Sequence, residues 1–146
     1  MPTYAAGDPA LEQNGPILLV MIGVDDTRAK GLAAQGQPIP TPVRARMLID
    51  TGASGTSVRV GLLAPLGLPV IGQITAGTAG AAVLCNVHFA KILFPPTWIP
   101  GVGWAGHITE VPLQGQNTID GLLGRDVLSK GIFNYSGALN GWSFSI

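Results

Sequence analysis

Arg46-Met47-Leu48-Ile49-Asp50-Thr51-Gly52-Ala53-Ser54 is the most informative stretch of this chain. It begins as a short apolar run of strand-forming residues, which predicts a β-strand over residues 43–49. The strand leads directly into the carboxylate of Asp50. Gly52 follows, where we expect the backbone to bend in a way that most side chains forbid. Because a carboxylate at the end of a buried strand loses hydration, its presence indicates a functional reason for Asp50.

A second informative stretch follows about 70 residues later: Ile119-Asp120-Gly121-Leu122-Leu123-Gly124-Arg125-Asp126-Val127-Leu128. Residues 122–124 predict a short buried strand, and residues 125–130 predict the helix that this strand enters. Gly131 stands where a glycine commonly ends a helix. The helix that follows this buried strand is therefore expected to begin with Arg125 and Asp126.

Together the two stretches resemble the active-site loop and the apolar-apolar-Gly-Arg-Asp/Asn segment of retropepsin-like (retroviral-type) aspartic peptidases. A lone Asp-Thr-Gly recurs by chance in many chains, whereas the pair in this order is much more specific. The resemblance covers residues from about 16 to 146 and implies an all-β, closed, barrel-like subunit with a flap hairpin and one short C-terminal helix. Residues 1–15 are small, polar and turn-rich, which predicts an N-terminal tail or arm before the domain of residues 16–146.

Catalysis by this family needs two carboxylates. Peptide hydrolysis requires a base that activates water and an acid that protonates the leaving nitrogen, and two neighbouring carboxylates divide these roles by sharing a proton. This chain has one Asp-Thr-Gly loop, because its other aspartates (Asp8, Asp25, Asp26, Asp120 and Asp126) are not followed by Thr/Ser-Gly. The resemblance therefore implies a two-fold homodimer with one Asp50 from each copy, acting on a peptide or protein without a cofactor or metal.

The resemblance also assigns roles around Asp50. Thr51 would hydrogen-bond to the other loop across the dimer, and Gly52 would let substrate backbone approach. Ala53 and Ser54 would border the substrate.

Leu122, Leu123 and Gly124 would support the loop, with Arg125 bracing it from the start of the helix. In the viral enzymes the arginine pairs with an aspartate at the position of Ser54, so this chain departs from the pattern there. Asp126 is interpreted as structural, with Thr56 or a helix-end amide as its partner.

Residues 71–84 predict a hairpin with a tip of small residues, which resembles the flap that closes over bound peptide. An ordinary surface hairpin is the alternative. The residues assigned to the flap and to substrate binding are Ile74, Thr75, Ala76, Gly77, Thr78, Ala79 and Gly80. Residues 142–146 are the candidate for an intersubunit strand, since alternation buries one face of this segment.

Composition limits the other classes of function. Charged residues make up 11% of the 146 residues and the net charge is zero, so nothing favours nucleic acid or an anionic membrane as a partner. The longest clean apolar run, residues 17–22, is too short to span a bilayer, and no secretory signal is visible. With a single cysteine, Cys85, the chain has no internal disulfide, which fits a soluble, cytoplasmic protein.

Two alternatives to a catalytic or metal-binding role are also considered. Residues 25–41 predict an exposed hairpin connection, in which Asp25-Asp26 forms a solvated turn rather than a pair of metal ligands. The whole domain could also serve as a catalytically weak or inactive dimerisation or peptide-binding module of the same fold.

Overall fold

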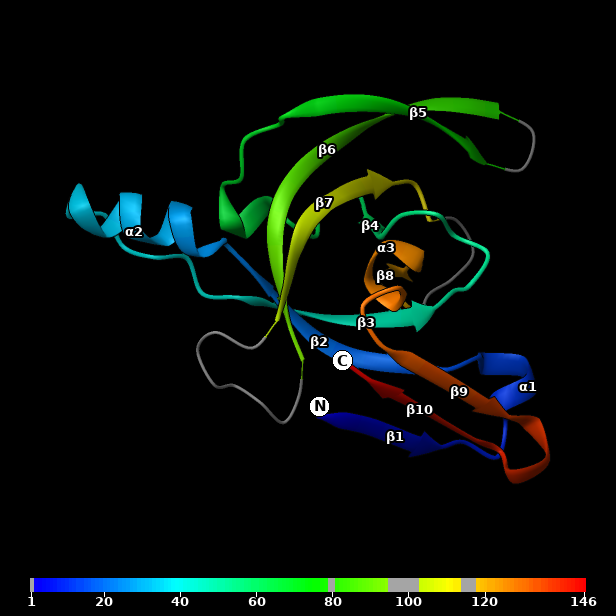
Figure 1. Cartoon of the computed structure of the whole chain (residues 1–146). Helices are drawn as coiled ribbons and strands as arrows, with labels where there is room; N and C mark the ends of the chain where they lie inside the picture. Colours follow the sequence, from blue (N-terminus) through cyan, green and yellow to red (C-terminus); the bar gives the residue numbers. More distant parts are fainter. Residues whose placement is uncertain (1, 79–80, 95–102, 114–117) are drawn as a thin grey trace.

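The computed structural model describes residues 2–78, 81–94, 103–113 and 118–146, which form a mostly β structure with few helices (Figure 1). Its strands are β1 (Thr3–Gly7), β2 (Ile17–Gly23), β3 (Val43–Ile49), β4 (Ser57–Arg59), β5 (Gly72–Thr78), β6 (Ala81–Leu93), β7 (Trp104–Val111), β8 (Gly121–Leu123), β9 (Ile132–Ser136) and β10 (Gly141–Ser145). Its helices are α1 (Leu11–Asn14), α2 (Asp26–Ala34) and α3 (Arg125–Leu128), with 3-10 turns η1 (Ala64–Leu66) and η2 (Gly137–Leu139).

The larger sheet closes on itself. Its strand order is β2-β3-β8-β4-β7-β6-β5, and β2 also pairs with β6. Strands β3 and β8 are parallel, as are β4 and β7, while β4 and β8 are antiparallel. This arrangement agrees with the predicted closed, barrel-like β subunit, and β5 alone continues beyond the closed part as an edge strand.

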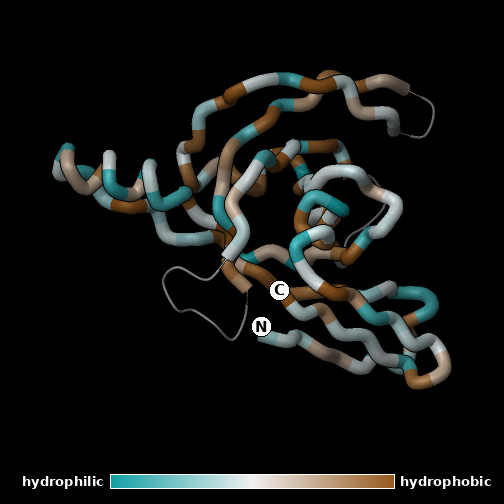
Figure 2. The backbone as a smooth tube through the Cα atoms, viewed as in Figure 1, coloured by the Kyte–Doolittle hydropathy of each residue, from teal (hydrophilic) through white to brown (hydrophobic). Residues whose placement is uncertain are grey.

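Alternation along the strands explains why the sheet closes. On β3, Ala45, Met47 and Ile49 are buried, while Arg44 and Arg46 are exposed. The neighbouring β2 buries Leu18, Val20 and Ile22 in the same core, so each strand has one apolar face. Figure 2 shows hydrophobic segments where β2, β6 and β7 converge, as expected for a sheet wrapped around its apolar side.

A second sheet joins the two ends of the chain, with strand order β1-β10-β9 (Figure 1). Residues 1–15 are predicted as a tail or arm, but the described part of this segment, residues 2–15, contains β1 and α1 and is packed on the core. Tyr4 is 6% exposed, with its ring centroid 5.8 Å from that of Phe94, and Leu11 is 1% exposed. The sequence conceals this packing because each short element buries a single large side chain.

Strand β10 lies between β1 and β9, so both of its backbone edges are paired within the chain. The expectation that residues 142–146 pair with a second copy is therefore not met. Buried Trp142 and Phe144 do line one face, as the alternation predicts. The edges left open in this sheet are those of β1 and β9.

Residues 25–41, predicted as a hairpin connection, contain the helix α2, which projects away from the sheets (Figure 1). Asp25 begins it as an N-cap, since its carboxylate accepts hydrogen bonds from Thr27 N at 2.9 Å and Arg28 N at 3.1 Å. Asp26 pairs with the Lys91 ammonium at 2.9 Å. The helix was missed because it has no buried face to create an apolar period.

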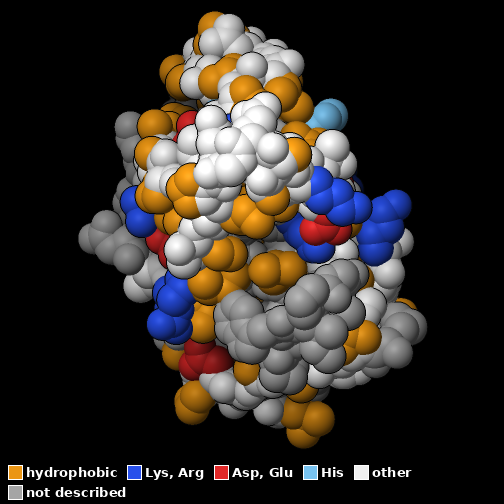
Figure 3. Space-filling model, turned by 90° about the vertical axis from the view of Figure 1, so that its left-hand side faces the viewer, with side chains coloured by type: hydrophobic (Ala, Val, Ile, Leu, Met, Phe, Trp, Pro, Cys, Tyr) orange, Lys and Arg blue, Asp and Glu red, His pale blue; other side chains and the backbone are white. Residues whose placement is uncertain are grey.

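Seen from the α2 end, the surface consists largely of hydrophobic and uncharged side chains, with the few charged ones toward the margins (Figure 3). No helix in the described ranges is long and apolar enough to cross a membrane.

Candidate active site

Asp50 is the first residue after β3, and it is held at both its backbone and its side chain. Its N–H donates to Leu123 O on β8 at 3.0 Å, and its Oδ1 accepts a hydrogen bond from Gly52 N at 2.8 Å. The side chain is half-buried. Within the part of the chain that the structure describes, Oδ2 accepts no hydrogen bond, so one carboxylate oxygen is fixed and the other is available.

The absence of a side chain at position 52 matters for a reason other than the predicted one. Gly52 does not have a positive φ, so the expected left-handed bend is absent. A Cβ at this position would instead lie 3.1 Å from Asp50 Oδ1. The missing side chain thus allows the close contact between the Asp50 carboxylate and the loop.

Arg125 braces the loop through backbone carbonyls. Its Nη1 donates to Thr51 O at 2.8 Å and to Gly52 O at 3.0 Å, and its backbone N donates to Ala53 O at 3.0 Å. Hydrogen bonds from a charged guanidinium are stronger than neutral ones. The loop is therefore held from the helix start although Ser54 replaces the aspartate of the viral pattern.

Asp126 fixes the far end of the loop. Its Oδ2 accepts a hydrogen bond from Thr56 N at 3.0 Å, and its Oδ1 accepts from Thr56 Oγ1 at 2.8 Å and from Val127 N at 2.9 Å. Thr56 Oγ1 in turn accepts a hydrogen bond from Gly124 N at 3.1 Å. Both partners expected for Asp126, Thr56 and a helix-end amide, are thus present.

The two informative stretches meet in space. Ile49 on β3 is in register with Leu123 on β8, although they are far apart in sequence. A Cβ at Gly124 would lie 2.5 Å from the carbonyl carbon and oxygen of Gly55, so only glycine allows the loop and the start of α3 to approach this closely.

A groove of about 410 Å³ lies beside the loop. Its walls combine loop residues 52–57, the β5 residues Ile74, Ala76 and Gly77, the segment Thr109, Val111, Pro112 and Leu113, and Leu122. None of these lining residues carries a charge. The groove thus separates the Asp50 loop from the β5–β6 hairpin, where the sequence predicts a flap.

The predicted flap residues are only partly placed at this groove. Ile74, Ala76 and Gly77 line it, and Thr75 does not. Thr78 pairs with Ala81 at the end of the hairpin. Ala79 and Gly80 lie outside the described residues.

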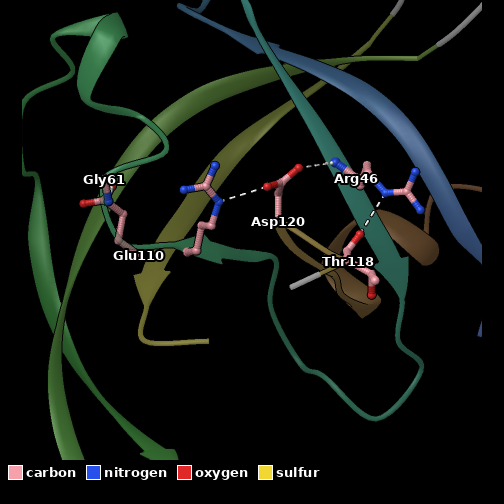
Figure 4. A network of polar contacts seen from close by, with 6 residues as sticks. Arg46, Gly61, Glu110, Thr118 and Asp120 are labelled. Carbon is pink, nitrogen blue, oxygen red and sulfur yellow. Dashed lines mark hydrogen bonds and ion pairs between the residues drawn. The ribbon is translucent and has the colours of Figure 1, made fainter. Parts of the chain in front are cut away.

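Asp120 forms a polar network next to the site that the sequence does not indicate (Figure 4). Its Oδ2 accepts from Arg46 N and its Oδ1 from Arg59 Nε, both at 2.9 Å, while Arg46 Nε donates to Thr118 O at 2.8 Å. The network joins β3 and β4 to the segment that enters β8. The only sequence signal for this network is the acid at the second position of the second informative stretch.

His88 has a structural position. It is buried, with Nδ1 3.0 Å from Pro69 O and Nε2 3.3 Å from Glu110 Oε2. Among the described residues no group of three or more His, Cys, Asp or Glu side chains could hold a metal ion.

No family model and no curated protein matches the sequence. Among solved structures, the chain is similar to a retropepsin-like aspartic protease from Rickettsia conorii, with a TM-score of 0.52 and 12% sequence identity. The match covers 98% of this chain and 90% of that chain. At this identity the likeness shows the fold alone, and the fold of this chain is retropepsin-like.

Proposed function

We propose that this chain is an aspartic endopeptidase that works as a two-fold homodimer, hydrolysing peptide bonds with a water activated between two Asp50 carboxylates. The observation that carries this proposal is the fixed Asp50 carboxylate: Oδ1 is held by Gly52 N–H, and the loop is braced by Arg125. The retropepsin-like fold supports the same conclusion.

One chain supplies half of the required chemistry. A single carboxylate cannot act as base and acid in the same step, whereas two close carboxylates share a proton and titrate as a pair. In the dimer, one Asp50 takes a proton from the attacking water and the partner's Asp50 donates a proton to the scissile group. Thr51, exposed at the loop, is available for a contact with the partner loop.

The uncharged groove suits an extended peptide with apolar or small side chains near the scissile bond. Ile74, Val111, Leu113 and Leu122 supply apolar contacts, and none of the described lining residues offers a charge to pair with a charged substrate side chain. We propose that the β5–β6 hairpin acts as the flap over this peptide.

The dimer interface is proposed to include the open edge of β9. Two apolar side chains of this strand are largely exposed, Ile132 at 59% and Tyr135 at 49%, and Leu139 in the following turn is 81% exposed. An exposed strand edge with apolar side chains is a ready surface for pairing with another chain.

Replacement of Asp50 tests the peptidase proposal. Asp50→Asn keeps the size of the side chain but cannot act as the base, so cleavage of a denatured protein substrate at acid pH is expected to fall at least a thousandfold. Glu12→Gln, an exposed change on α1, is the matched control and is expected to leave cleavage unchanged. Cleavage by Asp50→Asn at the parental rate would exclude the mechanism.

Two measurements separate a working peptidase from an inactive peptide-binding module, for which the favouring observation is that Asp50 is not among the residues that line the groove. A statine-type transition-state mimic should bind more tightly than a substrate peptide if the site is competent. Activity per subunit should fall on dilution, because the monomer holds half a site. Peptide binding without turnover in a proven dimer would favour the module.

A further inference from the structure

One pocket of the described part of the chain lies away from the candidate cleft. It has a volume of about 510 Å³ and lies between the smaller sheet and the outer face of β2 and β3. A second hollow of about 410 Å³ adjoins it and shares the residues Ala6, Ile17, Leu19 and Trp142. We call the two together the terminal-sheet groove.

The shared residues give this groove an apolar floor. Ile17 and Leu19 stand two apart on β2 and therefore point to the same side of the strand. Leu19 is 37% exposed, which is more than the core-facing residues of β2, so apolar surface remains open to a ligand. Trp142 contributes from β10 and Ala6 from β1.

Two guanidinium groups line the groove beside this floor. Arg44 and Arg46 lie on the exposed face of β3, two residues and roughly 7 Å apart along the strand. Arg44 has no hydrogen-bond or ion-pair partner among the residues that the structure describes. Arg46 uses Nε for Thr118 O, and its side chain points toward β2 (Figure 4), which leaves both Nη groups without a described partner.

The two acids of the groove are already occupied by other donors. Asp8 Oδ1 accepts from Ala10 N at 2.8 Å and its Oδ2 from Asn14 Nδ2 at 2.9 Å. Asp120 accepts from Arg46 N and from Arg59 Nε. The groove therefore offers free cationic donors, whereas its anionic acceptors are satisfied within the chain.

We propose that the terminal-sheet groove binds an extended segment of a partner protein that carries carboxylate side chains next to apolar ones. Guanidinium groups match carboxylates in geometry and charge, and the apolar floor would bury the neighbouring side chain. A peptide fits better than a nucleic acid, because the net charge is zero and the free cations number two rather than forming an extended basic face.

A binding experiment tests the proposal without reference to peptidase activity. The probe is a fluorescein-labelled peptide of two Leu-Leu-Glu-Glu repeats, which places leucines and carboxylates together on each side of the chain when it is extended. Fluorescence anisotropy is measured with the full chain carrying Asp50→Asn, so that turnover cannot interfere. Saturable binding is expected, at least fivefold tighter than for the matched Leu-Leu-Gln-Gln peptide, and weaker at higher salt.

Variants locate the binding. Arg44→Glu is expected to weaken binding at least tenfold, and Leu19→Asn at least threefold through the floor. Lys30→Glu, the same charge reversal on exposed α2, is the control and is expected to change binding less than twofold. Circular dichroism melting checks that each variant is folded.

Three results would overturn the proposal. The first is equal binding of the Glu and Gln peptides, or an Arg44→Glu variant that binds like its parent. The second is dissociation of the dimer by Arg44→Glu in sedimentation, which would make the groove an interface between copies. The third is an oligodeoxythymidine that binds more tightly than the acidic peptide.

Discussion

Thr56 is the residue where the support of the candidate site can be tested most directly. It is 1% exposed, its hydroxyl donates to Asp126 Oδ1 at 2.8 Å, and the same oxygen accepts from buried Gly124 N at 3.1 Å. Thr56→Val keeps the shape of the side chain and removes both hydrogen bonds. The variant therefore isolates the polar link between the end of the loop and α3.

The expected loss follows from these two contacts. A hydrogen bond to a charged group contributes about 1.5–3 kcal/mol, and an unsatisfied buried N–H costs about 1–3 kcal/mol. Because the contacts share one oxygen and relax together, we expect Thr56→Val to lower the free energy of unfolding by about 2–4 kcal/mol per subunit.

Urea denaturation at one fixed protein concentration measures this difference, since a dimer's apparent stability depends on concentration. Thr56→Ser is the matched control: it keeps the hydroxyl and loses one methyl group, for an expected loss of about 0.8 kcal/mol. If valine and serine destabilise equally, or if valine costs less than about 0.5 kcal/mol, the hydroxyl does not hold the loop and the reasoning is wrong.

Three further outcomes are expected. Arg125→Lys should lower kcat/KM for a peptide substrate at least tenfold, because an ammonium cannot reproduce the guanidinium contacts to the loop carbonyls. An unchanged kcat/KM with an unchanged pH–rate profile would show that Arg125 does not brace the Asp50 loop. Gly124→Ala should destabilise the chain by at least about 2 kcal/mol through its backbone clash, whereas Gly55→Ala, with open space around its Cβ, should stay near the parent in thermal melting. The Lys91 ammonium lowers the pKa of Asp26 below 3.8, first through its hydrogen bond and then through its charge. This pair therefore stabilises the fold above pH 3.8, and the stabilisation is lost as the pH falls through the pKa of Asp26 in the folded state. The stability difference between the parent and Asp26→Asn should thus be present at pH 7 and shrink below pH 3.8 in urea titrations; a difference that persists in strong acid would contradict this account.

Patterns within short stretches of the sequence predicted the strands and the helix that carry the candidate site. Strand β3 and its carboxylate end follow from an apolar run that meets Asp50, and β8 with α3 follows from two leucines, a glycine and a charged helix start. Helix α2 and strand β1 were missed for one shared reason. Neither element buries enough side chains to show an apolar periodicity. Helix α2 is instead stabilised by its N-cap, and β1 by distant partners such as Phe94.

The candidate site also has parts that the sequence predicted and parts that depend on the three-dimensional structure. Asp50 and Gly52 could be identified from sequence, but the reason for Gly52 could not, because it depends on where the Asp50 carboxylate points. The contribution of Thr109 and Val111 to the groove required the parallel pairing of β7 with β4, which no local pattern predicts. The partner of Arg125 was missed because backbone carbonyls have no sequence signature.

That last contact has an evolutionary consequence. Arg125 hydrogen-bonds to backbone carbonyl oxygens, which every amino acid has. Position 54 therefore does not need to supply an acid, and other small polar residues can replace Ser54 without loosening the loop. Saturation mutagenesis should accordingly find Ser54 permissive and Arg125 restrictive, an asymmetry that a side-chain ion pair between the two would not produce.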